Sequence, residues 1–337
     1  MKPNRVLAIV PVMLFCLTGT LFSLEPGDFF LSIKTDTEFG QLGEYVFGLN
    51  SQTSHDDILM SRITWGILPA VFSGFEGRLQ LGERFFANVD FSGAIPTPSG
   101  SVENKDWIAG NDPLDIATEE ETHYSLHDAY LRGAFTGEIY FGWDFRSRTH
   151  SIAPLLGFTS MYYNMDARDG YGVYPVEEMD FVGTVISYRQ WYNVPYVGIQ
   201  MKTGLEDTFH LQGTLKGSVF AFINAVDHHY RRERLGAGDS SGLEFYDTFY
   251  FKIVESNNQT FWIPGIFLEA NLRAEWDTSN NGSIWFSIGG TWVPPMQGNS
   301  LMLDTSDGTT SENENGAGAG MWMIRLTFGT SVNGWLY

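Results

Sequence analysis

The sequence predicts an all-β fold, a transmembrane antiparallel β-barrel of about ten strands. The first observation is a period of two in the hydrophobicity of several long stretches, which is the side-chain spacing of a strand. The second is that the polar face of these stretches often carries charge, while the other face is apolar and aromatic. The third is that long acidic loops alternate with short links. Together these features are typical of a barrel with lipid outside and a polar interior.

The first 23 residues have the pattern of a secretory signal peptide. Lys2 and Arg5 precede the apolar run Val6–Leu17, and small or polar residues follow. This run is shorter than the ~20 residues of a helical membrane span. The only cysteine, Cys16, lies inside it, so we expect a mature chain without disulfides. We expect residues 24–337 to form a single domain that is exported to the bacterial outer membrane.

The chain is strongly acidic, with 40 Asp and Glu residues against 20 Lys and Arg residues. Loss of Lys2 and Arg5 with the signal peptide makes the mature chain two charges more negative. Nucleic acid is excluded as an expected partner, because phosphate binding needs a basic surface. Cationic polypeptides would be attracted instead, although solubility of long exposed loops accounts for the acidity equally well.

The longest alternating stretch runs from Phe209 to Ala221, with apolar or small residues at the odd positions and polar residues at the even ones. Its polar face includes Lys216. Four further stretches alternate in the same way: 85–92, 268–276, 283–292 and 322–328. These five stretches are the basis for the predicted barrel wall.

The connections fall into two groups. Three long polar segments are expected to be loops: Pro96–Thr122, Leu235–Gly242 and Thr305–Gly320. Two short segments, Asn193–Pro195 and Asp277–Gly282, are expected to be tight links. Long loops on one side and short turns on the other are typical of outer-membrane barrels. No linker divides the chain.

The strand from Phe209 continues into Asp227-His228-His229-Tyr230. The period of two places Asp227 and His229 on one face, where an acid and an imidazole can form a base-orienting pair. His228 should then point the other way and take no part in such chemistry.

These residues, together with the segment Tyr188–Ile199 about thirty residues upstream, resemble the omptins, outer-membrane proteases of Gram-negative bacteria. In that family a Tyr, a basic residue and Gln lead into a Pro-Tyr-Ile-Gly-Leu strand, and an Asp-x-His-Tyr motif follows at nearly the same spacing. The resemblance implies that Asp227 and His229 are the catalytic dyad.

The resemblance also implies an acidic pair on the opposite wall, in an Asp-x-Asp-Trp motif. Here Asp106 and Trp107 match the second half of that motif, and Asn104 falls on the first aspartate. A one-residue insertion would give that position to Glu103 instead. In omptin-like chemistry a water between the two walls attacks the peptide bond, and Asn104 could hold this water but could not accept a proton.

Substrate and lipid contacts are carried over in the same way. Glu44 matches the family's glutamate in a pocket for a basic side chain, so we expect cleavage of cationic polypeptides next to basic residues. In the family a second acidic residue of this pocket lies two positions before the dyad aspartate, and Ala225 occupies that position here. Outer-membrane lipid is an expected partner, yet the strand that contacts lipopolysaccharide in the family carries Phe158, Ser160 and Tyr162 here.

We expect no cofactor and no metal centre, because His123, His127 and His210 lack the spacing of a zinc ligand set. Two function classes follow. The first is an omptin-like endopeptidase that uses an Asp/His-activated water. The second is a non-catalytic outer-membrane barrel, adhesive or structural, in which Asn104 marks a degenerate site. A general porin ranks third, because about ten strands leave a lumen largely filled by side chains.

Overall fold

The computed structural model describes residues 28–48, 58–108, 120–147, 150–175, 177–206, 208–230, 242–254, 260–278 and 282–335. Within these ranges there is no helix long and apolar enough to cross a membrane. The signal peptide expected at residues 1–23 lies outside the described residues.

Fifteen strands belong to a single sheet in this part of the chain. They are β1 (Asp28–Gly48), β2 (Ile58–Gln80), β3 (Phe85–Ala94), β4 (Thr97–Asp106), β5 (His123–Trp143), β6 (Phe145–Arg146), β7 (His150–Tyr174), β8 (Glu177–Glu206), β9 (Phe209–Ser218), β10 (Phe222–Tyr230), β11 (Gly242–Val254), β12 (Thr260–Ile263), β13 (Phe267–Asp277), β14 (Gly282–Asp304) and β15 (Thr310–Trp335).

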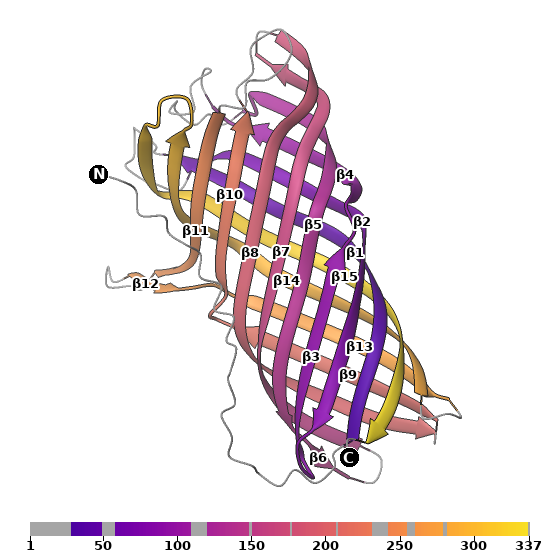
Figure 1. Cartoon of the computed structure of the whole chain (residues 1–337). Helices are drawn as coiled ribbons and strands as arrows, with labels where there is room; N and C mark the ends of the chain where they lie inside the picture. The colour runs from indigo at the N-terminus through magenta and orange to yellow at the C-terminus, as the bar shows by residue number, and fades with distance from the viewer. Residues whose placement is uncertain are drawn as a thin grey trace.

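The sheet closes into a barrel because β15 pairs with β1. Three places in the wall are each occupied by two short strands, which pair with different parts of the same long strand. β3 and β4 both pair with β2, β9 and β10 both pair with β8, and β11 and β13 both pair with β14. Counted this way, the described strands form ten positions around the barrel, all with antiparallel neighbours. Figure 1 shows strands that are strongly tilted and a barrel much longer than it is wide. The predicted antiparallel transmembrane barrel of about ten strands is confirmed.

Side chains alternate across the wall as the period of two requires. At the start of β1, Lys34 and Asp36 are buried in the lumen, whereas Leu31 and Ile33 are exposed on the outer face. Comparable exposed apolar residues occur on the outer faces of the other long strands, for example Phe141 on β5 and Leu156 on β7. They form the apolar belt of a membrane barrel.

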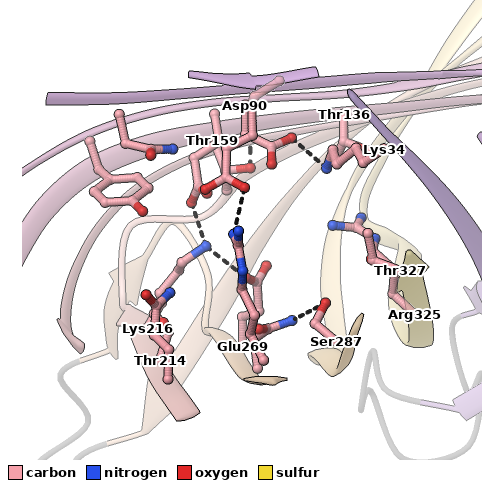
Figure 2. Close-up of a pocket in the computed structure, with 18 of the residues that line it drawn as sticks. Lys34, Asp90, Thr136, Thr159, Thr214, Lys216, Glu269, Ser287, Arg325 and Thr327 are labelled. Atoms are coloured by element: carbon pink, nitrogen blue, oxygen red, sulfur yellow. Dashed lines mark hydrogen bonds and ion pairs between the residues drawn. The ribbon is translucent and has the colours of Figure 1, made fainter. Parts of the chain in front are cut away.

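Ion pairs cross the lumen at the level of this belt (Figure 2). Lys216 on β9 donates to Glu138 on β5 at 2.6 Å and to Glu269 on β13 at 2.7 Å. Arg273 on β13 pairs with Glu76 on β2 at 2.8 Å. The Lys216–Glu269 pair joins the neighbouring strands β9 and β13. The Lys216–Glu138 and Arg273–Glu76 pairs join strands that are not neighbours in the sheet, so side chains fill the barrel here, which disfavours the porin interpretation.

Three predicted connections are wrong. Most of the expected loop Pro96–Thr122 that the structure describes is strand β4, and the expected loop Thr305–Gly320 enters β15 at Thr310. The expected link Asn193–Pro195 lies inside the 30-residue strand β8. Asn and Pro suggested a turn, but the alternating burial of the wall continues through Val194, and the strands extend well beyond the belt.

Candidate active site

The candidate site lies at the upper end of the barrel in Figure 1, between the ends of β10 and β11 on one flank and β4 on the other. The outer face at this level is charged on both flanks. Lys105 lies 3.6 Å from Glu103 on β4, and His228 lies 3.1 Å from Glu244 across β10 and β11. Charged outer faces place this level outside the hydrocarbon region.

Asp227 and His229 share the lumen face of β10, as their spacing predicts. β10 pairs with β8 and β11, so Asp227 lies opposite Tyr188 and Phe245. His229 Nε2 hydrogen bonds to Asp227 Oδ2. The aspartate side chain is 1% exposed and the imidazole 38% exposed, so the acid is buried behind a ring that a substrate can reach. His228 points to the outer face.

The Asp227 contact defines the chemistry of the imidazole. When Nε2 carries the proton that is donated to Asp227, the lone pair of the neutral ring is on Nδ1. The imidazole and the Phe245 ring pack in a T-shaped contact, with the centroids 5.5 Å apart. This arrangement holds a base whose tautomer is fixed by a buried carboxylate.

Glu44 reaches the dyad from β1. Its carboxylate, Asp227 and His229 each offer an atom within 4.8 Å of the others. Glu44 is 4% exposed, and Trp65 donates its indole N–H to Glu44 Oε2 at 3.2 Å. Trp65 in turn stacks on Tyr188, with the ring centroids 5.1 Å apart. Burial, and then the neighbouring charge of Asp227, raise the pKa of Glu44 well above its usual range.

Among the described residues, this trio has the geometry nearest to a metal-ligand set. However, the imidazole nitrogen that faces Asp227 is already hydrogen bonded to its carboxylate.

Asp247 on β11 is a buried acid that the sequence analysis missed. It lies directly across from Ala225, the position where the family resemblance places a second pocket acid. Burial raises the pKa of Asp247 to about 6, against the opposing effects of a hydrogen bond from Ser300 and of His229. On the other side of β10, Ala225 pairs with Gln190 of β8. The small Ala225 therefore lies between the carboxyl group of Asp247 and the amide of Gln190 on the lumen wall.

The opposite wall is formed by β4. Asn104 and Asp106 alternate with residues of the outer face, and they share the lumen side with the buried Val102. Asn104 Nδ2 donates to Asp106 Oδ2 at 3.3 Å, and Ser61 donates to Asn104 Oδ1 at 3.1 Å. The wall therefore holds an amide and a carboxyl in contact.

Asp106 faces the dyad closely enough to interact with it electrostatically. Burial raises the pKa of Asp106, whereas the neighbouring Ser61 hydroxyl, the nearby His123 and His229, and the hydrogen bond from Asn104 act in the opposite direction. Glu103, the alternative for the first acidic position, is on the outer face with Lys105. The register thus brings Asn104, and not Glu103, to the lumen beside Asp106.

A transmembrane barrel with a buried-acid/imidazole pair facing a second polar wall at one rim defines a narrow class of protein. The family model described as the Omptin family matches residues 28–332. The chain therefore belongs to the omptin family.

Two curated relatives and one solved structure show the extent of the similarity. The chain is 24% identical to Protease 7 of Escherichia coli O157:H7, over 92% of this chain and 91% of that protein. It is 24% identical to the outer membrane protease OmpP of E. coli K12, over 82% and 78% of the two chains. The crystal structure of the outer membrane protease OmpT from E. coli matches with a TM-score of 0.77 at 17% identity, covering 94% of this chain and 99% of that one.

Proposed function

We propose that this protein is an outer-membrane endopeptidase that cleaves polypeptides with a water activated by His229 and Asp227. The observation that carries the proposal is the half-exposed imidazole on a buried carboxylate, facing Asp106 across the rim. Membership of the omptin family and the protease names of the relatives support the same function and location.

The proposed reaction begins with a water between the two walls. His229 accepts a proton from this water through Nδ1, and the water oxygen attacks the carbonyl carbon of the peptide bond. Asp227 stabilises the imidazolium that forms. The C–N bond then breaks, and the leaving amine takes the proton from His229, which restores the neutral base.

On the second wall, Asp106 accepts a hydrogen bond from the water. Asn104 holds the Asp106 carboxylate by its amide N–H, and it contributes no proton transfer of its own. This wall therefore has one carboxyl group where the family resemblance implies two. We expect slow turnover, because only Asp106 can take part in proton transfer there.

The substrate side chain next to the cleaved bond is proposed to be basic. The buried carboxyl group of Asp247 lies directly across from Ala225, in the same part of the site as Asp227 and Glu44. The small Ala225, between Gln190 and Asp247, leaves room on the wall for a long side chain. A cationic group placed there would make charge-assisted hydrogen bonds.

The test is cleavage of a fluorogenic peptide with a central arginine by refolded protein in detergent, with and without added lipopolysaccharide. We expect His229→Ala to abolish cleavage. His228→Ala is the matched control, because His228 is the next residue on the same strand but lies on the outer face. The comparison with and without lipid also measures whether the chain needs that partner, since Phe158, Ser160 and Tyr162 offer it no positive charge.

The second candidate is a non-catalytic barrel with an adhesive or structural role, and Asn104 is the observation in its favour. Such a protein would fold and insert normally yet show no cleavage that depends on His229.

A further inference from the structure

The contact between Glu44 and Asp227 joins two buried carboxyl groups across the lumen, because β1 and β10 are not neighbours in the sheet. Hydrogen bonds from other side chains reach one oxygen of each carboxyl group. Glu44 Oε2 accepts from Trp65, and Asp227 Oδ2 accepts from His229. Asp227 Oδ1 is buried and accepts no hydrogen bond from a donor group in the described part of the chain. A buried carboxylate oxygen without a donor is costly.

A single proton resolves this arrangement. Two adjacent buried carboxyl groups cannot both be ionised at low cost, so one of them retains its proton. If Glu44 carries that proton, its O–H can donate a hydrogen bond to Asp227 Oδ1. This hydrogen bond would satisfy the buried oxygen.

The surroundings assign the proton to Glu44 and not to Asp227. Asp227 is in direct contact with the imidazole, whose partial or full positive charge favours an ionised partner. Burial and the charge of Asp247 raise the pKa of both carboxyl groups, so these effects do not separate them. The donor contacts do, because Glu44 has only a neutral indole as its donor.

We propose that Glu44 is a positioning residue of the proposed protease site: it is neutral, donates a hydrogen bond to Asp227 Oδ1 and thereby fixes the carboxylate that orients His229. This proposal rests on the proposed function and deepens it. It changes the role that the family resemblance implies for Glu44, since a neutral carboxyl group attracts no basic side chain. Asp247 is then the carboxyl group nearest to Ala225 that remains to carry charge towards a substrate.

The shared proton also affects the base. With Glu44 neutral, His229 lies beside one negative charge and not two. A second full negative charge within 4.8 Å would favour the imidazolium form over the neutral base.

Two substitutions separate the two roles of Glu44. Glutamine is neutral and can still donate to Asp227 while accepting from Trp65, whereas alanine can do neither. We expect Glu44→Ala to lower kcat by about 10²-fold and Glu44→Gln by less than about tenfold, with little change of KM in either variant. We expect Glu44→Gln to keep the preference for arginine over its neutral isostere citrulline at the cleavage site. Glu244→Gln is the matched control, because Glu244 lies on the outer face near the dyad.

The opposite pattern would overturn the proposal. If Glu44 is an ionised substrate contact, Gln and Ala substitutions will act alike, lowering the arginine-to-citrulline ratio through KM at constant kcat.

A second measurement needs no activity. Infrared spectra of the intact protein with 13C-labelled glutamate should contain a protonated carboxyl band at pH 7 that is lost in Glu44→Gln. Absence of that loss refutes the shared proton even if Glu44→Ala fails to fold. If no cleavage depends on His229, the proposed function fails, and the infrared result still decides the state of Glu44.

Discussion

Asn104→Asp should convert the second wall into an acidic pair and raise turnover. Asn104 Nδ2 lies 3.3 Å from Asp106 Oδ2, and aspartate would place an oxygen near that position. Two full charges at this separation repel each other by about 5 kcal/mol at an effective dielectric constant of about 20. This equals three to four pKa units, so the pair should hold one proton at neutral pH.

The shared proton gives the wall both an acceptor for the attacking water and a donor for the reaction. We expect kcat/KM to rise by about 10²-fold, the lower end of general acid–base effects. The pH–rate profile should gain an alkaline limb, because activity is lost when the pair gives up its last proton.

The assay is kcat/KM against pH for the wild type, Asn104→Asp and Glu103→Gln, with the same arginine peptide. Glu103→Gln should behave like the wild type, since Glu103 lies on the outer face with Lys105. An unchanged rate and profile in Asn104→Asp, together with loss of activity in Glu103→Gln, would show that the register assigned to β4 is wrong.

Two further predictions concern stability. The folded pKa of Asp247, about 6, is above its unfolded value, so ionisation of Asp247 disfavours the fold and its cost grows as pH rises from about 4 through 6. Asp247→Asn should therefore stabilise the barrel by about 1–3 kcal/mol at pH 7 and by little at pH 4; denaturant midpoints that are equally shifted at both pH values would contradict this. Lys216→Ala leaves Glu138 and Glu269 buried without their shared cation and should cost about 3–5 kcal/mol, measured by the same unfolding assay. A midpoint equal to that of the wild type would show that the lumen network is dispensable.

Much of the fold could be predicted because alternation is a local property of the sequence. Leu31 and Ile33 on the outside and Lys34 and Asp36 inside follow directly from a period of two. The strand ends could not be predicted in the same way. Asn193–Pro195 is composed like a turn, but pairing with β7 carries β8 through it.

The site was predictable only within single strands. The face shared by Asp227 and His229 follows from their spacing on β10. Asp247 was missed because its position opposite Ala225 depends on the register between β10 and β11, which the residue pattern does not reveal. The contact of Glu44 with the dyad crosses the lumen and depends on the curvature of the whole barrel.

The central claim is that Asp227 and His229 act as one unit to activate water. A double-mutant cycle on kcat/KM with Asp227→Asn, His229→Ala and the combined variant tests this directly, with folding checked for each protein. Because Asp227 acts only through the imidazole, we expect the double variant to be no slower than His229→Ala alone. Cleavage that survives His229→Ala, or losses that multiply in the double variant, would contradict the account.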